Sequence, residues 1–401
     1  MSETKQRRKT IRMSRGWVSY TTNAVIVGCA VVVSLGAAEL CIRWVKPQPT
    51  YSNLLEQVGS YYSPSDTNTW ELKKNYRGTE PSMENLGSRV SVSINSDGFR
   101  GPELEPNKKK VLMIGDSYTF GVYVNDNETY PFVLGRLLAK DFKNYQVTNA
   151  GFAAGLETDQ QYVWTKHNIK KLKPDVVVLG VFLANDISGI KTSAWQDIDA
   201  NGLPTKWLDS EFKVSESGVI KSTSSDQAKS VLQFLYKNEF LRESHLAIAI
   251  GRVSDRIFSF KKIDYVDAYK FIYGQYDAEF LEKETIFLRM IEAIRDEVVA
   301  EHSKFMVVML PINFMIEPEK MDKFFPNTQK LKGLNSTYYN RLERMLDSKG
   351  IRYLNIEKSM KSNPGGPYFP ENGEPHFNSN GHSFTAEQLY NFLLENEMVV
   401  K

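Results

Sequence analysis

The feature that most restricts the fold of this 401-residue chain is a regular alternation of short apolar runs and longer amphipathic segments from Lys110 onward. The runs are apolar along much of their length, which is typical of strands covered on both faces. We expect strands at 111–114, 145–148, 175–182, 304–310 and 351–356, and helices at 130–142, 158–172, 284–302, 336–348 and 383–395. This order predicts an α/β fold with three layers, α/β/α, around a central parallel sheet, flavodoxin-like in outline.

Two regions depart from this alternation. Residues 188–273 are polar, contain Trp195 and Trp207, and include a helical stretch at 228–240. We expect an insertion packed over one end of the sheet, which serves either as decoration or as a lid or platform for a substrate. Residues 46–107 are rich in Pro, Ser, Asn, Tyr and Glu, and they predict a stalk and a lead-in with short strands. The sheet-containing domain is therefore expected over 108–401.

The N-terminus has the pattern of a membrane anchor. Residues 1–15 form a basic tail, in which six Lys and Arg residues face one acidic residue, Glu3. No charge occurs between Gly16 and Ala38, and a helix of that length spans about 34 Å, enough for a hydrocarbon core of about 30 Å. Basic flanks stay in the cytoplasm. We therefore expect a single-pass anchor at 16–45 in the cell (inner) membrane, with everything after Val45 periplasmic or extracellular.

Three alternatives to an uncleaved anchor remain open. Gly36 and Ala38 fit the small-residue positions of a signal peptide cleaved before Glu39. Lipoprotein processing at Cys29 would follow an apolar run that is short for this purpose. Both alternatives leave the rest of the chain in the same compartment. The third is a buried helix of a soluble fold, which the basic flank disfavours.

Composition excludes several classes of function. The formal net charge is +2, so the chain has no overall field that would attract nucleic acid. Cys29 and Cys41 are its only cysteines, and both lie in or beside the apolar segment. They provide neither a disulfide framework nor a cysteine zinc site for the globular part.

Polar residues that suit acyl transfer follow several of the expected strands. Ser117 follows the first strand within Gly115-Asp116-Ser117, and at the C-terminus His376 stands two residues after Glu374. Between them come the glycine-containing segment 149–155 and the pair Asn185-Asp186. Gly-Asp-Ser alone is equally compatible with a turn and a helix cap. Together, however, these residues offer a nucleophile, oxyanion donors and a carboxylate–imidazole pair, which is the set that acyl transfer needs.

These four ordered blocks resemble the SGNH/GDSL hydrolase family, whose conserved blocks carry Ser, Gly, Asn and His. The lead-in from Asn95 to Glu103, with the sequence Asn-Ser-Asp-Gly-Phe-Arg-Gly-Pro-Glu, also resembles what precedes the serine block in membrane-anchored bacterial members. So do the segments 158–161 and 173–179. The resemblance covers residue 93 to the C-terminus, apart from the insertion.

The resemblance implies a role for each matching residue. Ser117 would be the nucleophile, with its backbone N–H as the first oxyanion donor. Gly155 and Asn185 would be the second and third donors. His376 would be the general base and Glu374 the acid that orients it.

The sequence departs from the family pattern at three points. Glu374 stands where an Asp is usual, so the acid has a longer reach. Leu183 replaces a glycine two positions before Asn185. The second block is one residue longer than usual, which leaves Gly151 as a second candidate for the role of Gly155.

The resemblance also implies a function. We expect an extracytoplasmic serine esterase or acylhydrolase that acts on acyl esters, with O-acetyl groups of an envelope or secreted glycan as the substrate. It implies no metal and no organic cofactor. A polysaccharide O-acetyltransferase would use the same residues, and lipid or thioester substrates are a further option. A glycan-binding envelope protein without catalytic activity is the alternative from a different class.

Overall fold

The computed structural model describes residues 3–48, 60–82, 88–223, 231, 234–235, 238–258, 270–321, 337–363 and 365–400. The chain forms two compact units. One, the helical unit, comprises residues 1–55 and 225–262, and the other, the sheet unit, comprises residues 56–224 and 263–401. Much of the expected stalk (49–59) and of the expected helix at 228–240 lies outside the described residues. The domain limits that we expect at 45 and 107 stay a prediction.

The sheet unit is built on five parallel strands. These are β5 (Lys109–Gly115), β6 (Tyr145–Gly151), β7 (Val176–Phe182), β12 (Lys304–Leu310) and β13 (Arg352–Asn355). Their order across the sheet is β13-β12-β7-β5-β6, and all neighbours are parallel. This is the flavodoxin-like order, in which the chain starts near the middle and reverses direction once. The predicted fold class is confirmed.

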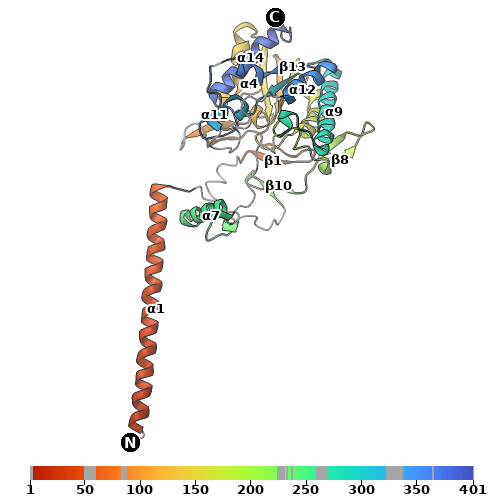
Figure 1. Cartoon of the computed structure of the whole chain (residues 1–401). Coiled ribbons are helices and arrows are strands. Elements are labelled where there is room, and N and C mark those ends of the chain that lie inside the picture. Colours follow the sequence, from red (N-terminus) through yellow and green to blue (C-terminus); the bar gives the residue numbers. More distant parts are fainter. Residues whose placement is uncertain are drawn as a thin grey trace. The chain divides into compact units, whose positions relative to one another are not determined.

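Helices cover both faces of this sheet (Figure 1). On one face α4 (Tyr130–Asp141) packs against α14 (Ser379–Glu395), and on the other α5 (Thr158–Leu172) packs against α9 (Ala278–Ala300). The helix α12 (Thr337–Ser348) lies on the α9 side, where Arg341 donates two hydrogen bonds to the Glu284 carboxylate. Right-handed crossovers require this arrangement. The connection through α4 leads from β5 to β6 at one edge of the sheet, whereas the connections through α5, α9 and α12 lead in the opposite direction, toward β13.

Within the sheet unit, the lead-in forms two antiparallel hairpins. Its strands are β1 (Tyr62–Ser65), β2 (Thr69–Leu72), β3 (Arg77–Pro81) and β4 (Arg89–Ser93). Tyr61, Trp70 and Val92 from this region are buried in the same core as the parallel strands. From residue 60 onward, the lead-in therefore belongs to the core of the sheet unit.

The expected insertion divides between the two units. The hairpin β8 (Trp195–Ile198) and β9 (Pro204–Trp207) contacts α5, and the hairpin β10 (Phe212–Val214) and β11 (Ile220–Ser222) contacts β1 and β2. Residues 225–262 belong to the helical unit instead. Shorter helices among the described residues are α3 (Ser117–Phe120), α10 (Asn313–Ile316), α11 (Pro318–Met321) and α13 (Ile356–Lys361), with 3-10 helices η1 (Asp126–Glu128), η2 (Thr192–Ala194) and η3 (Lys270–Tyr273).

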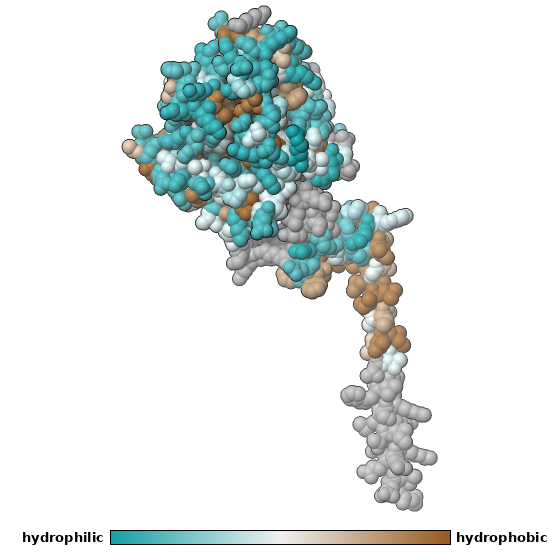
Figure 2. All heavy atoms as spheres, turned by 180° about the vertical axis from the view of Figure 1, so that it is seen from behind, coloured by the Kyte–Doolittle hydropathy of each residue, from teal (hydrophilic) through white to brown (hydrophobic). Residues whose placement is uncertain are grey.

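The helical unit contains α1 (Glu3–Val45) and α7 (His245–Phe258), which contact each other. Within α1, residues Thr22–Val45 are long and apolar enough to cross a membrane. Their apolar side chains are exposed, as Figure 2 shows along this helix. The length and composition of α1 agree with the predicted membrane segment, and a signal sequence would have the same properties.

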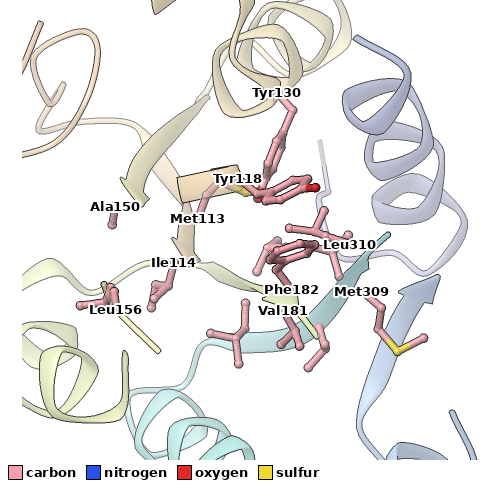
Figure 3. Close-up of a cluster of buried hydrophobic side chains, with 14 of the residues drawn as sticks. Met113, Ile114, Tyr118, Tyr130, Ala150, Leu156, Val181, Phe182, Met309 and Leu310 are labelled. Carbon is pink, nitrogen blue, oxygen red and sulfur yellow. The ribbon is translucent and has the colours of Figure 1, made fainter. Parts of the chain in front are cut away.

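The carboxyl ends of the strands rest on a dense apolar cluster (Figure 3). Tyr118, Phe182 and Leu310 point toward one another there, and the rings of Tyr118 and Phe182 are 4.2 Å apart. Met113 of β5 lies beside Tyr118, and both Met113 and Ile114 are fully buried. Interiors of this density give little room for a side chain to move, so this edge of the sheet is a rigid support.

Replacing Phe287 by Ala tests the packing of α9. The ring is fully buried, so its loss should lower the free energy of unfolding of the sheet unit by about 3–5 kcal/mol. Leu281→Ala on the same helix, where the side chain is 40% exposed, should cost far less. Urea denaturation of the detergent-solubilised protein measures both, and equal losses would show that α9 does not pack in this way.

Candidate active site

Ser117 lies at the carboxyl end of β5, where the sheet reverses its strand order. The strand ends at Gly115, and Asp116 then caps α3 by accepting a hydrogen bond from the Tyr118 N–H at 3.0 Å. A Cβ at position 115 would overlap the Thr119 hydroxyl, so the tight turn needs glycine there. In open α/β sheets, ligands bind at this switch point between neighbouring strands, here β5 and β7.

The hydroxyl of Ser117 is the first member of a continuous chain of hydrogen bonds. Its Oγ lies 2.8 Å from His376 Nε2, and His376 Nδ1 lies 2.5 Å from Glu374 Oε1. A carboxylate can only accept from Nδ1–H, which leaves Nε2 as the acceptor for the serine hydroxyl. The structure thus brings together Ser117, His376 and Glu374 in the order that a nucleophile, a base and an orienting acid require.

Tyr118 joins the loop of His376 to α3, the helix that begins at Ser117. Its hydroxyl donates to the carbonyl of Pro375, the residue before His376. Its ring lies 5.1 Å from the imidazole and 4.9 Å from the ring of Phe377, centroid to centroid. The residues on either side of this contact, Ser117 and His376, are consequently held in one packed cluster.

The expected oxyanion donors come from the loops after β6 and β7. Asn185 Nδ2 donates to Asp116 Oδ2 at 3.1 Å, which fixes the amide beside the residue that precedes Ser117 and leaves it a second N–H. Gly155 has a left-handed backbone (φ +63°), and a Cβ there would lie 2.6 Å from the Trp70 ring, so the position needs glycine. The N–H of Gly151, the other candidate, is already bonded to Asn149 Oδ1 at 3.0 Å. Leu183 is fully buried.

No family model and no curated protein matches the sequence. Several solved structures are similar. A lipase/acylhydrolase from Enterococcus faecalis has 14% identity and a TM-score of 0.36 over 72% of this chain and 96% of that one. A lipolytic protein of the G-D-S-L family from Desulfitobacterium hafniense has 15% identity and a TM-score of 0.34, over 71% and 99%. An acetyl xylan esterase, AlAXEase, has 12% identity and a TM-score of 0.35, over 71% and 99%. These are similarities of fold.

Arg100 of the lead-in holds the segment that follows α3. Its buried guanidinium donates to five oxygen atoms: the carbonyls of Ser91, Phe120, Gly121 and Val124, and Asp126 Oδ1. Asn95 prepares this position, because its side chain accepts from the N–H groups of Asp97 and Phe99 and closes the turn before Arg100. The motif from Asn95 to Arg100 could be recognised in the sequence, but the binding of Arg100 to the carbonyls at and after the end of α3 could not.

A buried carboxylate that sequence reasoning missed also reaches the site. Glu80 of β3 accepts from the Tyr61 hydroxyl at 3.2 Å and from the Tyr123 N–H at 2.8 Å. Burial raises the pKa of Glu80, and the positive charge of Arg100 partly offsets this. Tyr123 in turn places its ring edge-on to His376, 5.7 Å away. Nothing in the composition of the lead-in distinguishes Glu80 from its other acidic residues.

Three further acidic groups, Asp116, Asp186 and Glu157, are buried near Ser117 and Asn185. Burial raises the pKa of Asp116, although hydrogen bonds from Tyr118 and Asn185 lower it in part. Burial and the nearby charge of Asp116 raise the pKa of Asp186, which accepts from the Phe182 N–H at 2.7 Å. Burial also raises the pKa of Glu157 to about 7. A fraction of the Glu157 side chains is therefore protonated at neutral pH, which reduces the negative charge near Asp116.

His382, which we interpret from the sequence as structural, is buried below the loop after α3. Its Nδ1 accepts a hydrogen bond from the Tyr130 N–H at 3.2 Å, and its ring stacks on that of Tyr130. Burial, with smaller effects from Arg100 and His376, lowers the pKa of His382 to about 3. The ring is therefore neutral in the folded protein at neutral pH.

This neutral histidine should make stability fall in mild acid. The unfolded chain binds a proton at this side chain below pH 6.5, whereas the folded chain does so only near pH 3. The free energy of unfolding is therefore unaffected by this histidine above pH 6.5. As the pH falls from 6.5 toward 3, proton binding to the unfolded chain lowers the free energy of unfolding by up to about 1.4 kcal/mol per pH unit. His382→Asn keeps an acceptor but cannot titrate. Chemical denaturation between pH 7 and about 4 should show a shallower slope for this variant; parallel slopes would mean that His382 is charged when folded.

Proposed function

We propose that the sheet unit is a serine esterase of the SGNH/GDSL type, which cleaves acyl esters through Ser117, His376 and Glu374. The observation that carries this proposal is the chain of hydrogen bonds from Ser117 Oγ to His376 Nε2 and from His376 Nδ1 to Glu374, at 2.8 and 2.5 Å. Its position at the switch point of the sheet adds support, since substrates reach α/β folds at that edge.

The geometry suits an acyl-enzyme route. Ser117 Oγ attacks the ester carbonyl carbon while His376 Nε2 accepts its proton, and Glu374 stabilises the imidazolium through Nδ1–H. The negative charge that develops on the carbonyl oxygen is met by the Ser117 N–H, the Gly155 N–H and the Asn185 amide. The tetrahedral intermediate then collapses, and His376 returns the proton to the departing alcohol. Water, activated by the same histidine, releases the acid and restores Ser117.

The proposed substrates are O-acetyl esters on an envelope or secreted glycan, outside the cytoplasm. The basic tail and the apolar span of α1 support this location, because such tails remain inside. Two similar structures are described as an acetyl xylan esterase and an esterase active on acetylated mannans. A sugar hydroxyl in place of water would make the same residues an O-acetyltransferase.

Removing either the nucleophile or the base should abolish turnover of p-nitrophenyl acetate. Ser117→Ala and His376→Ala should each remove nearly all activity, and the double variant should be little worse, because residues that act as a unit are not additive. A fluorophosphonate probe should label the wild type and Ser348→Ala, which changes a serine on α12, but not Ser117→Ala. Substantial turnover by Ser117→Ala would refute the assignment. Adding an oligosaccharide acceptor and detecting its acetylation separates transferase from hydrolase.

The role of Glu374 is tested by two substitutions of different character. Glu374→Gln keeps the size of the side chain but favours the wrong tautomer and cannot support the imidazolium, a loss of about 10⁴ in kcat in a well-studied triad. Glu374→Asp keeps the charge and should retain most turnover. Steady-state kinetics of both variants gives the answer. If Glu374→Gln stayed active while Ser117 and His376 remained essential, the site would be a dyad without an acid.

A further inference from the structure

The helix α7 exposes apolar side chains that the described structure does not cover. Ile250 and Val253 are each 57% exposed, and with Leu246 they follow the i, i+4, i+7 spacing that places residues on one helix face. Just before the helix, Phe240 is 93% exposed and Leu241 is also exposed. An exposed apolar stripe on an amphipathic helix marks a surface that contacts something other than water.

The first turn of α7 is attached to α1 by the carboxylate of Glu39. Glu39 accepts hydrogen bonds from the Ser244 hydroxyl at 2.9 Å and from the N–H groups of His245 and Leu246 at 3.0 and 2.8 Å. These N–H groups have no partner within their own helix. Glu39 therefore acts as an N-terminal cap supplied by another helix, which fixes where α7 begins along α1.

A second polar contact lies just beyond the end of α1. The N–H of Gln48 donates to His245 Nδ1 at 2.7 Å, and Arg252 Nη1 donates to Gln48 Oε1 at 3.2 Å. The Gln48 side chain is buried by these contacts. Residues from two turns of α7 are thus hydrogen-bonded to Glu39 and to Gln48, at and just beyond the C-terminal end of α1.

This end of α1 is where the uncharged span stops. Glu39 is the first charged residue after Gly16–Ala38, and Trp44, 92% exposed, follows five residues later. Exposed tryptophan at the end of a membrane span is typical of the headgroup region. The cap at Glu39 consequently places the start of α7 at the depth where the hydrocarbon core gives way to headgroups.

We propose that α7 binds the outer surface of the same membrane that α1 crosses, with Phe240, Ile250 and Val253 inserted at the boundary of headgroups and acyl chains. A bilayer fits better than a second copy of the chain, because Glu39 holds the first turn of α7 at the end of the uncharged span of α1, where the membrane surface would lie. Amphipathic helices bind membranes in this way through buried apolar area. The inference rests on the anchoring part of the proposed function and is independent of the esterase chemistry.

The test uses the full chain in liposomes of phosphatidylcholine and phosphatidylglycerol, with Cys29 and Cys41 changed to Ser. A single cysteine introduced by Phe240→Cys, Ile250→Cys or Val253→Cys carries an environment-sensitive fluorophore. Lipids spin-labelled near the headgroup should quench each of these probes at least about twofold more than a probe at Glu279→Cys, which is exposed on α9 of the sheet unit. A probe at Leu35→Cys reports whether α1 is inserted.

The outcomes are distinct. Quenching at Leu35 without quenching at 240, 250 and 253 would overturn the proposal and leave the anchor intact. Fluorescence at these positions that changes with protein concentration but not with lipid quencher would overturn it in favour of a second copy. An unquenched probe at Leu35 would overturn both the anchor and the membrane contact of α7. Turnover of p-nitrophenyl acetate, measured on the same samples, reports separately on the esterase.

Discussion

The arrangement of the site depends first on the burial of one charge, the guanidinium of Arg100. A buried cation is costly unless its N–H groups are bonded, and here five oxygen atoms accept from it. Three of them are the carbonyls of Phe120, the last residue of α3, and of Gly121 and Val124, which follow it. The lead-in is therefore a structural part of the site, because Arg100 binds the chain where α3 ends; of these carbonyls, that of Phe120 also accepts from Asn149 Nδ2 at 3.1 Å.

The sequence predicted the sheet because its strands are covered on both faces. Residues Val176–Phe182 are all buried, so they are apolar without alternation and could be recognised. The meeting of Ser117, Asn185 and His376 could be expected because parallel strands end at one edge. The bond of Tyr118 to Pro375 and the approach of Glu80 to Tyr123 could not, since both join distant segments and leave no periodic signal. The division of the insertion between two units was equally hidden, because it depends on a polar cap supplied by Glu39.

The departures from the family pattern have local explanations in the structure. Glu374, one methylene longer than aspartate, still reaches His376 Nδ1, and the backbone around it is held by Asn313 Nδ2, which donates to the Glu374 carbonyl at 3.4 Å. Leu183 is buried in the core of the sheet unit rather than exposed at the site. The longer second block brings Gly155, rather than Gly151, to a loop position with a left-handed backbone.

The contact between Tyr118 and the loop of His376 has a consequence for catalysis. The serine and the histidine come from segments more than 250 residues apart, yet a residue adjacent to each one takes part in the same hydrogen bond. Their separation is therefore set when the chain folds and does not wait for a ligand. Interactions with the substrate are then available for stabilising the transition state rather than for assembling the catalytic groups. A site organised in this way needs no binding energy from a large substrate to bring Ser117 and His376 together.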